Sequence, residues 1–348
     1  MQTRIGVFVP NWVGDVVMAT PALRALRVKF GSEAELIGIM RPYVGDVLAG
    51  TSWLNRTITY DRKRISSMVH LSRNLRALSL DMVVLLTNSF STALLAWAGR
   101  TKRRIGHAMY HRRWLLTDWP DSISRQDEPR SAVDRYLDVV QILGCPIDDK
   151  QLELATSAAD RTTVAAMWHR FGWHERQPVV VFNTGGAYGA AKVWPPEHFR
   201  ELAKQLIAQR DVCVLFLCGP AERSTVRDIC RQIGDPRVRS VADQTLGIGL
   251  SKACVQRACA MVTTDSGPRH FAAAFKVPTV TLFGPTDPRW SANYHDVSIN
   301  LQLDMNCVPC SRRVCPHGHH RCMRDLTVAQ VLSATLSLLD RATVKHVA

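Results

Sequence analysis

The sequence predicts an α/β protein built from two doubly wound parallel sheets, and three observations support this prediction. Short runs of Val, Ile and Leu recur in both halves of the chain, with helical segments between them. These runs do not alternate with polar residues, which is typical of strands covered by helices on both faces. The length of 348 residues is long for one core and suits two domains. We therefore expect two Rossmann-like domains that face each other across a cleft.

In the first half, runs typical of buried strands lie at residues 4–9, 36–40 and 82–86. The turn at residues 10–14 leads from the first strand into a helix near Asp15. Thr20 and Pro21 follow within that helix, and proline suits a first helical turn but disrupts a helix interior. We therefore expect the helix to kink or restart at this point.

The second half repeats the pattern. Expected strands lie at residues 179–183, 212–218, 261–264 and 279–283, and expected helices at residues 161–173, 197–210 and 221–233. Residues 147–159 are polar and lack a pattern, so the domain boundary is placed there, giving domains at residues 1–158 and 159–326. The segment 327–348 is expected to contribute a final amphipathic helix, clearest over residues 327–339.

The composition indicates a soluble protein with a strong positive charge. The formal net charge is +14, which favours polyanionic partners such as nucleic acid, an anionic membrane or phosphorylated substrates, or else serves solubility alone. The basic residues are spread over 62–64, 100–104 and 112–113 rather than gathered in a tail, so we expect a broad basic face and no nucleic-acid binding. No apolar run is long enough to span a bilayer and the start does not resemble a signal peptide, so we expect a cytoplasmic protein.

The loop after the first strand contains a candidate catalytic carboxylate that would act as a base. In parallel sheets, ligands bind beyond the carboxyl ends of the strands, where loops meet helix N-termini. Asp15 follows Gly14 at such a position, and a carboxylate there can take a proton from an attacking hydroxyl. Helix capping is the alternative role, since aspartate favours the N-cap.

The loop after the strand at 179–183 is rich in glycine and includes Thr184, Gly185 and Lys192. Glycines expose backbone N–H groups that bind anions well near a helix N-terminus, and Lys192 can supply a charge to a diphosphate. The spacing matches neither the dinucleotide fingerprint nor the P-loop, which disfavours a dehydrogenase. An ordinary flexible connection is the alternative.

Two further loops carry residues suited to a nucleotide. Asp265, Ser266, Gly267 and His270 lie between a strand and a helix, where phosphate or ribose contacts form readily. Asp265 could instead cap the helix, and His270 could be a structural histidine. Glu222 follows a Gly-Pro turn, where it could bind a ribose diol or stabilise the first turn of a helix.

Taken together, the segments at residues 11–23, 192–199, 263–274 and 282–288 resemble glycosyltransferase family 9, the bacterial lipopolysaccharide heptosyltransferases, and most closely their heptosyltransferase II type. These segments read NWVGDVVMATPAL, KVWPPEHF, TTDSGPRHFAAA and LFGPTDP, and they span most of the chain. The chain departs from the family pattern at Tyr188 and Gly189, where an acidic or amide residue is typical.

The resemblance implies a GT-B fold, with an N-terminal acceptor domain, a C-terminal nucleotide-sugar domain and a final helix that packs back on the first domain. It also implies an inverting transfer from ADP-heptose that needs no catalytic metal. Asp15 would then be the general base. The residues that would hold the donor are Thr184, Gly185, Lys192, Glu222, Asp265, Ser266, Gly267 and His270.

The expected acceptor is the inner core of lipopolysaccharide, which would receive its second L-glycero-D-manno-heptose. Arg62, Lys63 and Arg64 would bind its phosphates and acidic sugars. The net charge suits peripheral contact with the anionic inner membrane at its cytoplasmic face. Two alternatives stay open, namely transfer to a protein or another surface glycan, and a non-catalytic nucleotide-sugar-binding module, which the presence of Asp15 disfavours.

A cysteine cluster lies near the end of the chain. Cys307, Cys310, Cys315 and Cys322 surround three histidines, His317, His319 and His320. Four thiolates, or three with a histidine, could hold a structural zinc ion, although a second C-x2-C pair is absent. Disulfides and reduced thiols are the other two possibilities.

Overall fold

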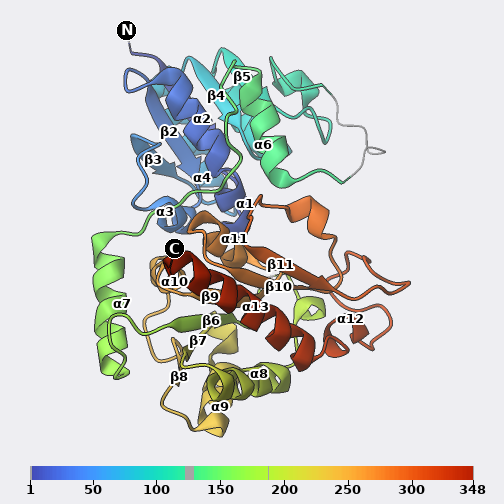
Figure 1. The fold of residues 1–348 in the computed structure, drawn as a ribbon. Helices are drawn as coiled ribbons and strands as arrows, with labels where there is room; N and C mark the ends of the chain where they lie inside the picture. Colours follow the sequence, from blue (N-terminus) through green and yellow to red (C-terminus); the bar gives the residue numbers. More distant parts are fainter. Residues whose placement is uncertain (1, 122–128, 187, 348) are drawn as a thin grey trace. The chain divides into compact units, whose positions relative to one another are not determined.

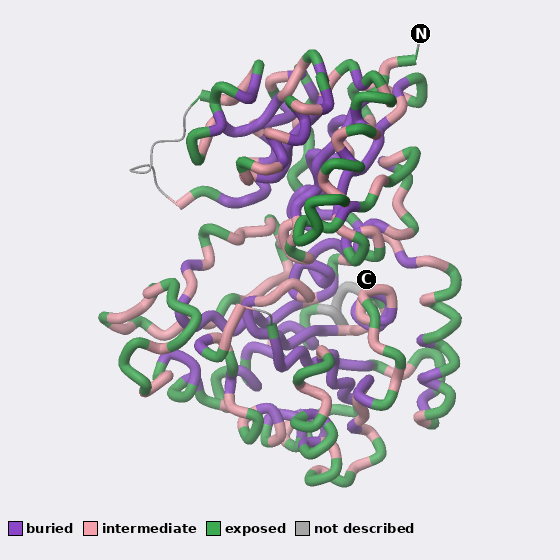
Figure 2. The backbone as a smooth tube through the Cα atoms, turned by 180° about the vertical axis from the view of Figure 1, so that it is seen from behind, coloured by how far each residue is buried: buried purple, intermediate pink, exposed green. Residues whose placement is uncertain are grey.

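The computed structural model describes residues 2–121, 129–186 and 188–347 of the chain (Figure 1). The chain divides into two compact units. Unit 1 comprises Met1–Ala155 with Arg289–Asn293, and unit 2 comprises Thr156–Pro288 with Tyr294–Ala348. Buried backbone runs through the inside of each unit, and exposed backbone follows the outer helices and loops (Figure 2).

Unit 1 contains a five-stranded parallel sheet of order β3-β2-β1-β4-β5. Its strands are β1 (Arg4–Phe8), β2 (Glu35–Met40), β3 (Arg56–Thr59), β4 (Met82–Leu85) and β5 (Arg103–Gly106). Its helices are α1 (Val13–Met18), α2 (Thr20–Phe30), α3 (Pro42–Leu48), α4 (Ile65–Leu78), α5 (Phe90–Ala98), the short η1 (Arg113–Leu115) and α6 (Ala132–Gln141). Beyond their first residues, β1 and β4 are entirely buried, as expected for continuous apolar runs in central strands.

Unit 2 contains a six-stranded parallel sheet of order β11-β10-β9-β6-β7-β8. Its strands are β6 (Val179–Asn183), β7 (Cys213–Leu217), β8 (Val238–Ser240), β9 (Ala260–Thr264), β10 (Thr279–Phe283) and β11 (Ser298–Gln302). Its helices are α7 (Ala158–Arg170), η2 (Ala190–Lys192), α8 (Pro196–Gln209), η3 (Pro220–Glu222), α9 (Arg223–Ile233), α10 (Ile248–Gln256), α11 (Gly267–Ala274), α12 (Arg321–Arg324) and α13 (Val328–Val347). The short η4 (Pro288–Ser291) begins in unit 2 and continues in the 289–293 segment of unit 1.

Both sheets confirm the predicted fold class, two doubly wound α/β domains of the GT-B kind. In each sheet the strand order reverses at the first strand of the unit, β1 or β6. Ligands bind at such reversals, beyond the carboxyl ends of the strands. Asp15 follows β1, and the loops that carry Thr184 and Asp265 follow β6 and its neighbour β9.

Local signals act as expected at several element ends. Helix α1 ends at Met18 and α2 begins at Thr20, so the predicted restart is confirmed. Ser157 caps α7 in a capping box with Asp160. The final helix α13 contacts α8, β9 and β10 of unit 2. The proposed packing of that helix on the first domain stays a prediction.

The expected basic face needs one correction. Arg112 is completely buried, and its guanidinium donates hydrogen bonds to the carbonyl oxygens of His107 at 2.8 Å and Thr87 at 2.7 Å. Arg112 therefore ties the end of β4 to the segment after β5 and adds nothing to the surface. No helix in the described ranges is both long and apolar enough to cross a membrane.

Candidate active site

Asp15 lies in the first turn of α1, directly beyond the carboxyl end of β1. The helix N-cap is Trp12, and no side-chain hydrogen bond caps the helix, so Asp15 does not act as the N-cap. Burial raises the pKa of Asp15 from 3.8 to about 6, and the positive charge of Arg135 opposes this rise. A carboxylate with a pKa near 6 is ionised at neutral pH and is basic enough to accept a proton.

Helix α6 supplies the surroundings of Asp15. Arg135 lies over the ring of Trp290, with 5.6 Å between its Cζ atom and the ring centroid. The carbonyl oxygen of Arg135 lies 2.7 Å from Nε2 of His107. Burial, with the negative charge of Asp15, holds the pKa of Tyr136 well above its usual value. Asp15 is thus flanked by a fixed cation and by a phenol that stays protonated.

In unit 2, one side chain joins the loops that follow β6 and β9. The amide of Asn183 donates hydrogen bonds to the carbonyl oxygen of Gly185 at 2.9 Å, to Oγ1 of Thr263 at 3.1 Å and to Oγ of Ser266 at 2.9 Å. Gly186 packs so closely on Ser266 that an added Cβ would lie 2.9 Å from the serine Cβ. The two loops predicted to bind the donor therefore form a single structure.

Asp265 is the centre of this structure and is buried. Its carboxylate accepts a hydrogen bond from Thr286 at 2.7 Å and forms ion pairs with Lys192 and, at 3.1 Å, with Arg269. Burial opposes ionisation, but Arg269 and Lys192 outweigh it and lower the pKa of Asp265 to about 2. Asp265 is therefore a permanent anion, and capping, the alternative role, is wrong because Ser266 is the N-cap of α11.

Lys192 reaches this carboxylate from η2. Its ammonium group also donates to the carbonyl oxygen of Asp265 at 3.1 Å and lies 4.2 Å from the ring centroid of Tyr188. The hydroxyl of Thr184 is buried and has no hydrogen-bond partner within the described residues. An ammonium group on a flexible stem and an unsatisfied buried hydroxyl together can receive an anionic oxygen.

Glu222 lies against the same loop. Its carboxylate accepts a hydrogen bond from the backbone N–H of Gly219 at 2.5 Å. A Cβ on Gly185 would lie 2.1 Å from Oε1 of Glu222, so a larger residue there would displace the Glu222 carboxylate. Glu222 thus caps η3 and also lies beside the loop that carries Gly185.

His270 and Gly267 lie on α11, beyond Ser266. His270 is buried, and burial together with Arg269 holds its pKa well below the usual value. The imidazole is therefore neutral at physiological pH and can contact a ligand only as a neutral hydrogen-bonding group.

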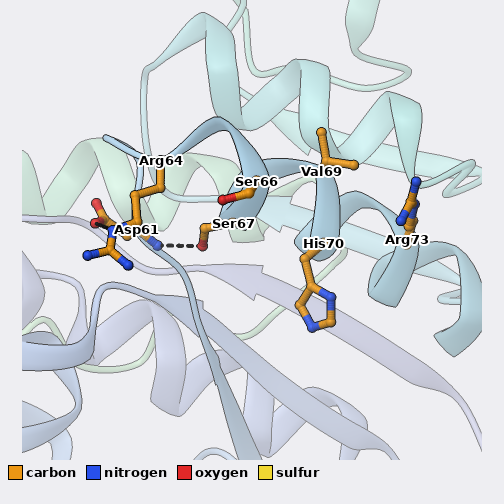
Figure 3. A pocket seen from close by; sticks show the side chains of 7 residues that line it. All are labelled: Asp61, Arg64, Ser66, Ser67, Val69, His70 and Arg73. Atoms are coloured by element: carbon orange, nitrogen blue, oxygen red, sulfur yellow. Dashed lines mark hydrogen bonds and ion pairs between the residues drawn. The ribbon is translucent and has the colours of Figure 1, made fainter.

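The three basic residues expected to bind the acceptor are exposed at the start of α4. Arg64 is the N-cap of α4 and pairs with Asp61 at 3.6 Å, while Asp61 also accepts a hydrogen bond from the backbone N–H of Lys63 at 2.9 Å. A hollow of about 730 Å³ opens beside this turn (Figure 3). It is lined by Asp61, Arg64, Ser66, Ser67, Val69, His70 and Arg73. Arg62 and Lys63 lie next to the hollow in the sequence but do not line it.

The four cysteines of the cluster line one small cavity of about 10 Å³, together with Ala191 and Pro285. All four are free thiols, so the disulfides considered above are not formed. No group of three or more His, Cys, Asp or Glu side chains in the described chain is arranged to hold a metal ion. The four thiols nevertheless converge on one cavity, and the structural zinc site stays a prediction.

The cysteine-containing loop packs against the loop that carries Lys192. The Tyr188 hydroxyl donates to the carbonyl oxygen of Ser311 at 2.8 Å, and the backbone N–H of Ala191 donates to the carbonyl oxygen of Arg313 at 3.1 Å. The segment therefore fixes the position of the loop that carries Lys192.

Sequence reasoning missed Asn183, Arg269, Thr286 and, in unit 1, Arg135. Asn183 ends an apolar strand at a sheet switch point, which is a signal that could have identified it. Arg269 lies four residues after Asp265, the spacing of an ion pair on a helix. Thr286 and Arg135 carry no such local signal, since tertiary packing alone brings them to their sites.

Comparison with known proteins places these sites in a family. The model of glycosyltransferase family 9 (heptosyltransferase) matches residues 68–320. The lipopolysaccharide heptosyltransferase 2 of Escherichia coli is 28% identical over 97% of this chain and 98% of its own length. The lipooligosaccharide heptosyltransferase 2 of Campylobacter jejuni is 26% identical over 97% of this chain and 99% of its own.

A solved structure agrees with these relatives. The E. coli ADP-heptose lipopolysaccharide heptosyltransferase II is 25% identical, with a TM-score of 0.80 over 97% of this chain and 99% of that chain. The family match covers more than half of the residues, and the parallel sheets and loop positions fit it. The chain is therefore a glycosyltransferase that belongs to glycosyltransferase family 9, the heptosyltransferases.

Proposed function

We propose that this enzyme transfers L-glycero-D-manno-heptose from ADP-heptose to the heptosyl inner core of lipopolysaccharide, as the second heptose. The likeness to lipopolysaccharide heptosyltransferases over nearly the whole chain supports heptose transfer to lipopolysaccharide. The choice of the second heptose follows the relatives named heptosyltransferase 2.

One observation carries the donor assignment. Lys192 and Arg269 meet at the Asp265 carboxylate, beyond the carboxyl ends of β6 and β9, and Thr184, directly after β6, has a buried hydroxyl without a hydrogen-bond partner in the described residues. Arg269 keeps Asp265 ionised, so Lys192 can turn from Asp265 to the diphosphate of the donor. The proposed donor site is completed by residues from the segments that follow β6, β7 and β9, namely Gly185, Glu222, Ser266, Gly267 and His270.

The proposed reaction inverts the anomeric centre. An acceptor hydroxyl oxygen attacks the anomeric carbon, the bond from that carbon to the diphosphate oxygen breaks, and ADP leaves with the bonding electrons. Asp15 accepts the hydroxyl proton, for which its raised pKa is suited. Lys192 stabilises the negative charge that develops on the leaving diphosphate. We assign this charge stabilisation to protein cations, so the reaction is proposed to need no catalytic metal.

The acceptor is proposed to bind unit 1 through Arg62, Lys63 and Arg64. The hollow beside α4 supports this assignment, because Arg64, His70 and Arg73 line it together with serine hydroxyls that can bind phosphate oxygens. The domain roles, acceptor for unit 1 and donor for unit 2, belong to the same proposal. We place the enzyme in the cytoplasm, at the inner face of an anionic membrane, and without a nucleic-acid partner.

The test is a transfer assay in the presence of EDTA. The full chain is mixed with ADP-heptose and a core acceptor that bears one heptose, and ADP release and acceptor mass are followed. A gain of one heptose supports donor, acceptor and metal independence together. Tight binding of ADP-heptose without transfer to this acceptor would contradict the proposed acceptor and favour a protein, another glycan or a binding module.

A further inference from the structure

Unit 1 exposes large apolar side chains on one layer of its helices. Ile65 on α4 is 80% exposed, Trp97 on α5 is 51% exposed and Trp114 on η1 is 64% exposed. Phe90, at the start of α5, is also exposed, and its ring centroid lies 6.0 Å from that of Trp114. These side chains come from three separate segments, so no single amphipathic stretch of sequence explains them.

The three segments form one layer over the sheet. Helix α4 contacts α5, and α5 contacts η1. Arg76 of α4 donates to the carbonyl oxygen of Ala98 at the end of α5, at 3.1 Å. Their inner side chains share one core cluster, which includes Leu71, Leu75, Leu95 and Leu115 among others. The exposed side chains named above are therefore not part of this core cluster.

The exposed residues follow the outward stripes of these helices. On α5, Phe90 and Trp97 are seven residues apart, which places them on the same side two turns apart. On α4, Ile65 and the exposed Val69 are four residues apart. Soluble proteins rarely leave such a patch uncovered unless it contacts a partner or a membrane.

Positive charge surrounds this apolar surface. Arg62, Lys63 and Arg64 precede Ile65, and Arg73 continues the outer stripe of α4. Arg113 adjoins Trp114 and lies over the ring of Trp119, 4.7 Å from its centroid. The hollow of Figure 3 opens on the same layer, since Arg64 and Val69 both line it. Tryptophan with basic side chains is the combination that suits an anionic headgroup region.

We propose that the layer formed by α4, α5 and η1 is a docking surface for an anionic lipid bilayer. Trp97, Trp114, Phe90 and Ile65 enter the boundary between headgroups and acyl chains. Arg73 and Arg113 contact anionic headgroups, while Arg62, Lys63 and Arg64 stay assigned to the phosphates of the acceptor at the same surface. The positive charge favours a lipid surface over a second copy of this chain, whose identical basic layer would repel it. This inference rests on the proposed function, which places the enzyme at the inner face of an anionic membrane, and it takes the sugar acceptor to be anchored in the same bilayer.

The test is co-sedimentation of the full chain with vesicles. Phosphatidylcholine vesicles containing half phosphatidylglycerol are compared with vesicles of phosphatidylcholine alone. The wild type should bind the anionic vesicles, and added salt should weaken this binding. The double variant Trp97→Ser, Trp114→Ser should lower the partition coefficient about tenfold. Val28→Ser is the matched control, because Val28 is 63% exposed on α2 and should leave binding unchanged.

Two further readouts separate the possible failures. Transfer to a delipidated, soluble one-heptose acceptor should proceed at the wild-type rate in the double variant, because docking is not needed there. Failure of the wild type on that acceptor would count against the proposed function, while vesicle binding would still test the surface. Equal vesicle binding by wild type and double variant would overturn the docking surface. So would a wild-type dimer in analytical ultracentrifugation that the double variant dissociates.

Discussion

At the residue scale, the proposed chemistry depends on two carboxylates whose environments shift their pKa values in opposite directions. Burial raises the pKa of Asp15 to about 6, whereas Arg269 and Lys192 outweigh burial at Asp265 and lower its pKa to about 2. Asp15 can therefore exchange a proton near neutral pH, and Asp265 cannot. This difference separates the proposed base from a structural anion, which residue type alone could not do.

Asp15→Asn should lower the turnover number by about 10² to 10⁴, because general-base assistance contributes this much. The affinity for ADP-heptose, measured by calorimetry, should stay close to the wild-type value, since Asp15 lies in unit 1 and the proposed donor loops lie in unit 2. Glu33→Gln, at an exposed position after α2, is the control. Near-normal turnover of Asp15→Asn would show that another group is the base.

The pH dependence should follow Asp15. The carboxylate is the active form, so kcat/KM should fall as the pH drops below about 6, and this limb should vanish in Asp15→Asn. Stability should change in the opposite sense. Because the folded pKa is raised, ionisation disfavours the folded state, and this cost appears as the pH rises from about 4 to about 6. At pH 8, the free energy of unfolding of Asp15→Asn should therefore exceed that of the wild type by about 1 to 2 kcal/mol, and the variant should unfold at a higher temperature. At pH 4, the two proteins should unfold at nearly the same temperature. An unshifted kcat/KM limb near pH 4 would contradict the raised pKa.

Lys192→Ala should weaken ADP-heptose binding about tenfold or more and should also lower turnover, since one charge-assisted contact to the diphosphate is lost. Lys204→Ala on the exposed side of α8 is the matched control. Calorimetric titration of both variants checks this. Unchanged affinity in Lys192→Ala would mean that Lys192 serves only as a partner of Asp265.

At the element scale, the buried strands were predictable and the edge strands were not. Residues 179–183 and 279–283 coincide with β6 and β10, because continuous apolar runs are typical of central parallel strands. The edge strands β3, β5, β8 and β11 were missed. β3 is mostly exposed and reads RTIT, and β11 is only partly buried and reads SINLQ. An edge strand is fixed by pairing with its neighbour, which local sequence does not record.

The position of the loop that carries Lys192 is expected to depend on its contacts with the cysteine-containing loop. Substitution of Gly189 tests this dependence. Its φ angle is +146°, and an added Cβ would lie 2.6 Å from the backbone oxygen of Arg313. Gly189→Ala should therefore displace the loop that carries Lys192, destabilise the protein by about 1 to 3 kcal/mol and weaken ADP binding. Gly247→Ala is the control, since a Cβ there would meet nothing within 4 Å. Thermal unfolding with and without ADP measures both effects, and equal behaviour of the two variants would contradict the proposed coupling.

At the scale of the whole molecule, the alternation of strands and helices in both halves of the chain was enough to predict the fold class. The four loops with unusual residues were correctly located at strand ends. The Asn183 amide and the Lys192–Asp265 ion pair join two of the loops that were predicted to bind the donor. The sequence could not show that Arg112 is buried or that the four cysteines converge on one cavity as free thiols. Both outcomes depend on contacts between segments distant in the chain.

The division into two units predicts separate ligand responses. ADP should slow hydrogen exchange of backbone amides in the loops that follow β6, β7 and β9 of unit 2, because binding suppresses their local opening. The sheet of unit 1 should exchange as in the free protein. Hydrogen–deuterium exchange with mass spectrometry gives this comparison. Protection confined to unit 1 would reverse the proposed roles of the units.

The central claim is transfer of a second heptose to the lipopolysaccharide core, and acceptor choice tests it most directly. Core acceptors that bear no heptose, one heptose or two heptoses are incubated separately with the enzyme and ADP-heptose, and product masses are measured. The account predicts that only the acceptor with one heptose gains a further heptose, and that Asp15→Asn fails on it. Equal or faster transfer to the acceptor without heptose would contradict the account.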